Sequence, residues 1–205
     1  MAGRRFARAG ALCAYIEVRR VQKAVDRTEL GNLLLSVSYL EGDFVLRSGK
    51  RSRYYLDKYL FETDPRVLGG VVREMASLIR HRMGERGEYA RLAAPELGAV
   101  SIGAGLSLEL GMPFVIVRKQ TKEYGTGKAI EGAWHPGERF AVVEDIVTSG
   151  GAALSAVEQL RALGLVVEDL YCVVDREEGG RENARKMGLE LIPLFTAGGL
   201  GIKKG

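Results

Sequence analysis

Two adjacent carboxylates, Glu144 and Asp145, stand between an apolar run and a turn of small residues. The run Phe140 to Val143 predicts a buried parallel strand, and the apolar residues after the turn recur at helical spacing. Ligands of open α/β sheets bind beyond the carboxyl ends of the strands, where a helix N-terminus offers free N–H groups. The turn Thr148 to Gly151, with its two glycines and two hydroxyls, is therefore predicted to bind a phosphate.

The two carboxylates cannot bind that same phosphate, because like charges repel. Their acceptor oxygens suit sugar hydroxyls or a hydrated Mg²⁺ ion. Phosphate on one side and carboxylates on the other describe a site for a ribose 5-phosphate. An ordinary strand-to-helix turn with two solvated acids is the alternative interpretation.

Two better-known phosphate motifs are excluded. Gly127-Lys128 is followed by Ala129 and has Lys122 where a P-loop needs its first glycine. Gly103-Ala104-Gly105 lacks the third glycine of the dinucleotide fingerprint. Nucleotide binding through either motif is not expected.

Three further stretches carry charge at positions that suit ligand binding. Residues 118–128 follow the predicted strand 114–117, contain four basic residues and two glycines, and predict a long loop that closes over a polyanion such as pyrophosphate. The run 175–178 follows a predicted strand at 166–174. The stretch 44–57 predicts a hairpin with basic residues near its turn and Tyr55 as a flat surface for a planar ligand. Solvated surface charge is the alternative for the loop and the hairpin.

The composition limits the possible classes of protein. A chain of 205 residues with 46% hydrophobic residues suits one globular domain. The net charge of +4 comes from residues 1–25, which hold six basic residues and one acid, so the charge gives no reason to expect nucleic-acid binding. This segment is predicted to be a poorly ordered extension, with an initial helix as the alternative. The apolar stretch at 11–16 is too short to span a membrane.

The cysteines and histidines are few. Cys13 and Cys172 lack metal-ligand spacing and are expected to be reduced in a cytoplasmic protein. With only His81 and His135, a histidine-rich metal site is impossible and a Ser-His-Asp triad is weakly supported.

The remaining pattern is that of an α/β protein. Thr28 is a possible N-cap of the first predicted helix, Asp64-Pro65 is a typical helix start, and the tail 198–205 is expected to fray. Helices are predicted at 26–40, from 64 to near 84, at 99–110 and at 182–187, and further strands at 91–94 and 189–195.

The run Glu144-Asp145-Ile146-Val147-Thr148-Ser149-Gly150-Gly151 resembles the phosphoribosyl pyrophosphate (PRPP) motif of type I phosphoribosyltransferases. Three other stretches resemble the orotate phosphoribosyltransferase family in order and spacing: Phe44 to Leu56, Arg118-Lys119-x-x-Lys122-x-Tyr124-Gly125-x-Gly127, and Asp175-Arg176-Glu177-Glu178. The resemblance covers roughly residues 28–197. It implies an α/β fold in a single domain, 26–205, whose central, mainly parallel sheet is flanked by helices (core about 61–197) and carries a small N-terminal hood (about 26–60).

The resemblance also implies a reaction: PRPP and orotate, with Mg²⁺ as cofactor, give orotidine 5′-phosphate and pyrophosphate. Glu144 and Asp145 would hold the ribose hydroxyls directly or through Mg²⁺, and with Lys122 they are the expected catalytic residues. Arg176 would bind the orotate carboxylate, with Thr148 near the base and Tyr55 stacked on its ring. The other expected PRPP-binding residues are Arg47, Arg118, Lys119, Lys122, Tyr124, Ile146, Val147, Thr148, Ser149, Gly150, Gly151 and Ala152. Members of the family are homodimers that share the loop, so Arg118, Lys122 and Tyr124 would reach the neighbouring site while Lys119 serves its own.

Some positions depart from the family pattern. Arg47 stands where a lysine is usual, and Leu56 stands where an aromatic residue is common. Tyr124 stands where many members have a histidine. Leu97 stands where some members have a lysine that binds PRPP. A PRPP-binding role for position 97 is therefore not expected. Two alternatives remain: a phosphoribosyltransferase for a purine or another pyrimidine, and a PRPP-sensing regulator that binds nucleic acid. The retained basic loop argues against the regulator.

Overall fold

The computed structural model describes residues 26–45, 51–119 and 129–202 of the chain. The predictions for the extension 1–25, Cys13, Arg47, Lys122 and Tyr124 lie outside these residues. In the part of the chain that is described, no helix is long and apolar enough to cross a membrane.

A six-stranded sheet forms the centre of the molecule, with the strand order β5-β4-β3-β6-β7-β8. All neighbouring strands are parallel except β4 and β5, which confirms the expected mainly parallel sheet. The two-residue strand β5 was not predicted, because so short a segment carries no period. The strands are β3 (Arg91–Pro95), β4 (Phe114–Val117), β5 (Ile130–Glu131), β6 (Arg139–Val147), β7 (Val166–Asp175) and β8 (Glu190–Thr196).

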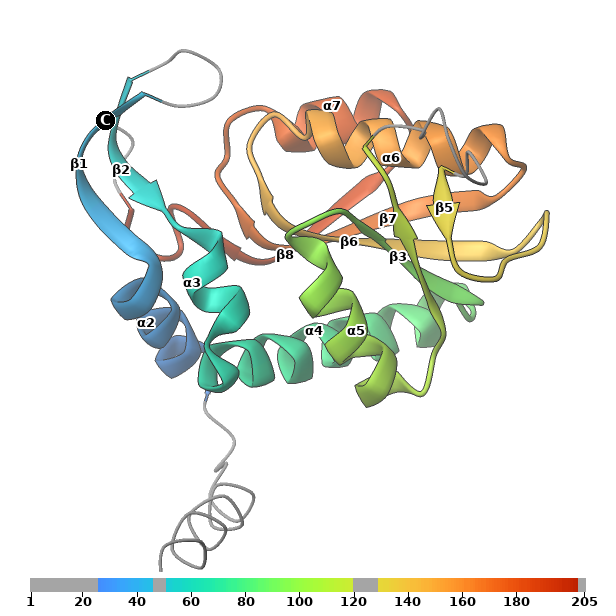
Figure 1. Cartoon of the computed structure of the whole chain (residues 1–205), viewed down its shortest axis with the longest axis horizontal. Coiled ribbons are helices and arrows are strands. Elements are labelled where there is room, and N and C mark those ends of the chain that lie inside the picture. The colour runs from blue at the N-terminus through green and yellow to red at the C-terminus, as the bar shows by residue number, and fades with distance from the viewer. Residues whose placement is uncertain (1–25, 46–50, 120–128, 203–205) are drawn as a thin grey trace, which may run out of the picture.

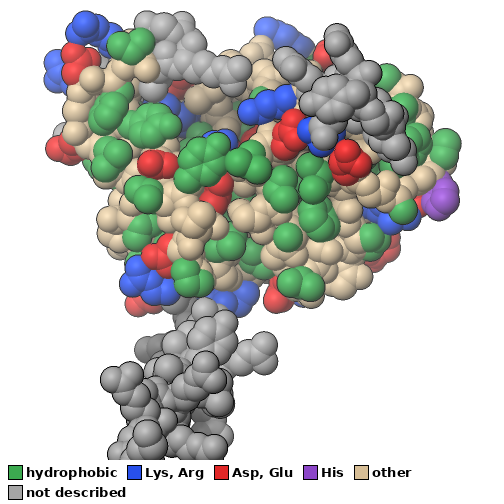
Figure 2. Space-filling view, viewed as in Figure 1, with side chains coloured by type: hydrophobic (Ala, Val, Ile, Leu, Met, Phe, Trp, Pro, Cys, Tyr) green, Lys and Arg blue, Asp and Glu red, His purple; other side chains and the backbone are tan. Residues whose placement is uncertain are grey.

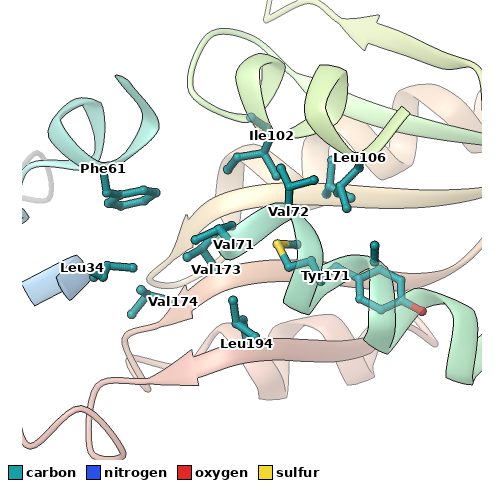
Figure 3. Packing of buried hydrophobic residues seen from close by; sticks show 14 of the residues in the cluster. Leu34, Phe61, Val71, Val72, Ile102, Leu106, Tyr171, Val173, Val174 and Leu194 are labelled. Atoms are coloured by element: carbon teal, nitrogen blue, oxygen red, sulfur yellow. The ribbon is translucent and has the colours of Figure 1, made fainter. Parts of the chain in front are cut away.

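Helices cover both faces of this sheet (Figure 1). One face packs against α4 (Pro65–Arg86) and α5 (Ala99–Leu110), and the other packs against α6 (Gly151–Ala162) and α7 (Gly180–Lys186). Successive residues of β6 therefore join different hydrophobic clusters: Phe140 and Val142 pack with α6, and Ala141 and Val143 with α4 and α5. Figure 3 shows side chains of α4 and α5 meeting those of β7 and β8 on the face that α4 and α5 cover. Burial on both faces explains the continuous apolar run at 140–143.

The N-terminal hood precedes α4 and consists of α2 (Arg27–Ser38), the antiparallel strands β1 (Tyr39–Val45) and β2 (Arg51–Leu56), and the short helix α3 (Lys58–Thr63). Leu30, Leu34 and Phe61 are fully buried in the same cluster that α4 and α5 form with the sheet. The hood is therefore packed continuously onto the core, and the expected division near residue 60 falls inside α3.

Several predicted boundaries were wrong. Asp26, not Thr28, caps α2, because its carboxylate accepts from the backbone N–H of Glu29 at 2.8 Å in a capping box. That helix ends at Ser38, and the next residue begins β1. Helix α4 continues past Gly84 to Arg86 and ends at Gly87, whose φ of 89° suits glycine. The bounds of α5 and β4 were predicted correctly.

The beginning of the tail does not fray as predicted. Ile202 is buried in the core cluster and donates its backbone N–H to the Ala197 carbonyl at 3.0 Å. Residues 203–205 lie outside the described part.

Candidate active site

A cluster of buried carboxyl groups, here called the acidic pocket, lies at the carboxyl end of β6. This strand is longer than predicted and runs to Val147, so Glu144 and Asp145 lie within it, and both are buried. The Asp145 Oδ1 atom accepts from the backbone N–H of Ile146 at 2.5 Å, and Oδ2 accepts from Lys58 Nζ at 2.5 Å. Glu62, one turn beyond Lys58 in α3, is also buried. The hood thus adds one cation and one further acid to the predicted pair.

Burial and mutual repulsion change the proton affinity of this pocket. Burial, followed by the charge of Asp145, raises the pKa of both Glu62 and Glu144 to about 8. Burial is the largest single influence on the pKa of Lys58 and lowers it, but the charge and hydrogen bond of Asp145, together with the charges of Glu144 and Glu62, outweigh burial, so the net shift is upward. Lys58 is therefore a permanent positive charge among carboxyl groups of which Glu62 and Glu144 tend to stay neutral near pH 7.

The small-residue turn after β6 leads directly into α6, as predicted. Gly150 has a φ of 84°, and α6 begins at the next residue with no side-chain cap among the described residues. Its first N–H groups therefore point out of the helix without internal partners. A Cβ atom built on Gly180 would lie 2.7 Å from the Thr148 carbonyl oxygen, so glycine is required where α7 touches this turn. Asn183 holds the turn as well, by donating to the Ser149 carbonyl at 3.0 Å.

Arg176 lies directly after β7, and its side chain is buried. Its backbone N–H donates to the Val147 carbonyl at 2.8 Å, which places it beside the end of β6. Its guanidinium carbon lies 4.7 Å from the centre of the Tyr54 ring, and its Nε atom is 2.9 Å from a Glu178 carboxylate oxygen. The arginine that was predicted to bind a substrate carboxylate is thus stacked on one side and paired with an internal carboxylate on the other.

Tyr54 and Tyr55 point to opposite faces of the hairpin, as neighbours in a strand do. Tyr54 is buried and stacks on Tyr39 as well as on Arg176. Tyr55 is 39% exposed and packs against Phe44. The structure therefore brings Tyr54 to Arg176, and the predicted contact of Tyr55 with a ligand stays a prediction.

The two ends of the predicted loop are held together. Arg118 donates its backbone N–H to the Ala129 carbonyl at 2.9 Å, and its guanidinium lies 3.8 Å from Glu96 and 3.5 Å from Glu131. The Arg118 Nε atom is buried and has no hydrogen-bond partner among the described residues. Lys119 is exposed, and its backbone N–H donates to Glu96 at 2.9 Å. Both described basic residues therefore lie at the carboxyl end of β4, in line with the predicted location of the loop.

Sequence reasoning missed four residues of this site: Lys58, Glu62, Tyr54 and Asn183. The only available signal was the spacing of four between Lys58 and Glu62, which puts them on one face of a helix. Because α3 has only six residues, its period was too short to detect.

Comparison with known proteins gives a consistent result, although a scan against protein-family models found no match. A curated orotate phosphoribosyltransferase from Methanocella arvoryzae is 47% identical over 171 residues, 83% of this chain and 94% of that protein. Another, from Natronomonas pharaonis, is 48% identical over 159 residues, 78% of this chain and 87% of that protein. The chain belongs to the orotate phosphoribosyltransferase family. Among solved structures, the orotate phosphoribosyltransferase of Mycobacterium tuberculosis matches with a TM-score of 0.72 and 30% identity, covering 85% of this chain and 98% of that one.

Membership in the orotate phosphoribosyltransferase family agrees with the geometry. The acidic pair with the glycine turn, Arg176, and the ends of the basic loop come from three separate motifs. They lie at the carboxyl ends of β6, β7 and β4, at the same edge of the sheet.

Proposed function

We propose that this chain transfers the ribose 5-phosphate of PRPP to orotate, giving orotidine 5′-phosphate and pyrophosphate in de novo UMP synthesis. The observation that carries this proposal is the meeting of a phosphate turn, an acidic pair and a buried arginine at one sheet edge, in a member of this family. A Mycobacterium tuberculosis relative with 29% identity to this chain has been solved in complex with PRPP.

The ribose 5-phosphate part of PRPP would bind between the turn and the acidic pocket. The N–H groups at the start of α6 and the hydroxyls of Thr148 and Ser149 suit the 5-phosphate, with Gly150, Gly151 and Ala152 allowing close approach. Ile146 and Val147 lead into the turn; the Val147 carbonyl also positions Arg176. Asp145 and Glu144 would accept hydrogen bonds from the ribose hydroxyls.

Orotate would bind against Arg176. A guanidinium can donate two parallel hydrogen bonds to a carboxylate, so the fork of Arg176 suits the carboxylate that distinguishes orotate from other pyrimidines. Orotate would take over the contact that Glu178 makes in this structure. Thr148 and Tyr55 are the further residues that we propose for the base.

The basic loop would act on the leaving group. Breaking the bond between C1 and pyrophosphate builds negative charge on the pyrophosphate, and Lys and Arg side chains around it stabilise that charge as it develops. Arg118 and Lys119 lie where they could do so, and Lys122, Tyr124 and Arg47 are proposed for the same role. Closure over the site would also exclude water that could hydrolyse PRPP.

Mg²⁺ is proposed as the cofactor, and the donor set fits this ion. Carboxylate oxygens are ligands that Mg²⁺ prefers, and Asp145 is the residue that would hold it. Among the described residues, no group of three or more His, Cys, Asp and Glu side chains could hold a metal alone. The ion would therefore complete its coordination with phosphate oxygens and water, and when bound it would neutralise charge on the pyrophosphate.

A homodimer that shares the loop between subunits is also proposed, as is a cytoplasmic location. One face of the chain supports association, because exposed apolar side chains gather over α3 and α5 (Figure 2). Leu60, Leu97 and Leu108 are 43%, 66% and 87% exposed.

The decisive experiment is a measurement of pyrophosphate release from PRPP in the presence of Mg²⁺ and one base at a time. Release that depends on orotate, and is much slower with uracil or adenine, is the expected result. Preference for another base would replace orotate in the proposal. Absence of turnover together with nucleic-acid affinity would support a regulator instead.

A further inference from the structure

Lys58 is a charged residue of the site. It belongs neither to the small-residue turn nor to the residues that were expected to contact PRPP. Its side chain belongs to α3 in the hood, yet its Nζ atom lies 2.5 Å from Oδ2 of Asp145 in the core sheet. The Lys58 side chain is 30% exposed, and that of Asp145 is 4% exposed. The lysine therefore approaches the buried carboxylate from the side that is open to solvent.

The two hydrogen bonds that Asp145 accepts do not use all the lone pairs of its carboxylate oxygens. Its Oδ1 atom accepts one hydrogen bond, from the Ile146 N–H, and its Oδ2 atom accepts one from Lys58. Each carboxylate oxygen has two lone pairs, so each can accept one more hydrogen bond. Lys58 thus fixes the orientation of the carboxylate without using up its acceptors.

The same lysine sits where three acids and the start of α5 converge. A Cβ atom built on Gly98 would collide with Asp145 Oδ2 and would lie 2.7 Å from Lys58 Nζ and 2.8 Å from Glu62 Oε1. That Glu62 oxygen is buried and has no hydrogen-bond partner among the described residues. Glu144 is buried beside Asp145. PRPP is a polyanion, so its approach to the Asp145 carboxylate is opposed unless a cation offsets that charge.

We propose that Lys58 is a positioning residue for PRPP, resting on the proposed function. Its ammonium holds Asp145 in the orientation that accepts the ribose hydroxyls, and it offsets the negative charge of Asp145 toward the phosphates of PRPP. The hood therefore contributes to binding of the sugar phosphate as well as of the base.

The test is calorimetric titration of PRPP, at fixed Mg²⁺ concentration, into wild type, Lys58→Met and Lys58→Arg. Lys58→Met is expected to raise the Kd for PRPP by about ten- to a hundredfold, the range for losing a hydrogen bond between charged groups. Lys58→Arg should recover most of the affinity. In steady-state assays of Lys58→Met, the KM for PRPP should rise while the KM for orotate changes little.

Two outcomes would overturn the proposal. A lower melting temperature with unchanged PRPP affinity would make Lys58 a link between hood and core only. Tighter binding of PRPP to Lys58→Met would make the lysine a competitor of the substrate. Arg91→Met is the matched control, because Arg91 forms a partly buried ion pair with Glu138 at 2.8 Å at the opposite end of the sheet.

A second pair of variants covers the case in which Lys58→Met does not fold. Gly98→Ala keeps the lysine but forces it and Asp145 apart, so it should also weaken PRPP binding; unchanged affinity would contradict the proposal. Gly84→Ala is its control, because a Cβ there meets no atom within 4 Å.

The wild-type results separate this proposal from the proposed function. If wild type binds PRPP but does not turn over orotate, the function fails while the comparison of affinities still decides the role of Lys58. If wild type does not bind PRPP, both fail.

Discussion

The acidic pocket and Arg176 are both held by the hood, but in different ways. Asp145 receives an opposite charge from the hood, the ammonium of Lys58 at 2.5 Å. Arg176 receives an aromatic face from the hood, the Tyr54 ring at 4.7 Å, and takes its opposite charge from Glu178, two residues along the chain. The hood is thus an electrostatic partner on the side proposed for the sugar and a packing partner on the side proposed for the base.

This difference predicts how each half responds to change. Charge pairing in a buried, crowded pocket is strong and leaves an uncompensated charge when one partner is removed. Stacking of a guanidinium on a ring is weaker, and its loss leaves the ion pair with Glu178 in place. Substitutions on the side proposed for the sugar should therefore reduce catalytic efficiency more than substitutions on the side proposed for the base.

The largest effect is expected for Asp145→Asn. The change removes the acceptor charge for the ribose and leaves Lys58 without its partner. The rate constant kcat/KM for PRPP should fall by about a hundred- to a thousandfold, the range for losing one preorganised electrostatic contact. Pyrophosphate release measures this, and Glu138→Gln, at the far end of the sheet, is the control. A fall in kcat/KM of less than about tenfold would show that substitutions in the acidic pocket do not have the larger effect.

Arg176→Lys should have the next largest effect. Lysine keeps the positive charge but lacks the planar fork and the flat surface that meets Tyr54. The KM for orotate should rise by about ten- to a hundredfold, the range for losing charge-assisted hydrogen bonds, while the KM for PRPP stays within about twofold. If both constants rose in parallel, the two halves of the site would not act separately.

Tyr54→Leu should have a smaller effect on the KM for orotate than Arg176→Lys. Loss of the stacked ring is expected to raise the KM for orotate by about two- to thirtyfold, because the substitution frees the guanidinium without removing it. Tyr55→Leu is the matched variant, with the same change on the opposite face of β2. A larger effect of Tyr55→Leu would favour direct stacking of Tyr55 on the base over support of Arg176 by Tyr54.

The contrast between the acidic pocket and Arg176 also explains what could be predicted from the sequence. Glu144, Asp145, the glycine turn and Arg176 each lie at the carboxyl end of a buried strand, so local patterns were enough to single out these residues as candidates and to predict the sheet that carries them. Lys58 and Tyr54 act across the fold: Lys58 lies 87 residues from Asp145, and neither residue has a neighbour in sequence that indicates its partner. The position of the hood on the core, which depends on packing of Leu30, Leu34 and Phe61, had to be known first.

The ends of elements were harder to predict for a related reason. Helix α2 ends at Ser38 although apolar residues continue, because Tyr39 pairs with Leu56 across the hairpin. At the ends of elements, pairing with a distant strand overrides the hydrophobic periodicity of the local sequence. The strand β6 similarly includes two acids because pairing with β7 continues to Val147.

The smallest effect is expected in the stability of the protein, and it concerns Glu62. The folded-state pKa of Glu62 is about 8, whereas the ordinary value is 4.5, because burial and then the charge of Asp145 oppose its ionisation. The folded protein therefore holds a proton that the unfolded chain releases, so this contribution is complete below about pH 4.5 and is lost as the pH rises through about 8. The melting temperature of wild type should accordingly fall between about pH 5 and pH 8.5.

The variant Glu62→Gln tests this cause. Its side chain at position 62 cannot ionise, so its melting temperature should fall less steeply over the same pH range. Glu158→Gln, an exposed change in α6, should follow wild type, and a Glu62→Gln curve parallel to wild type would show that the acidic pocket does not exclude the charge of Glu62.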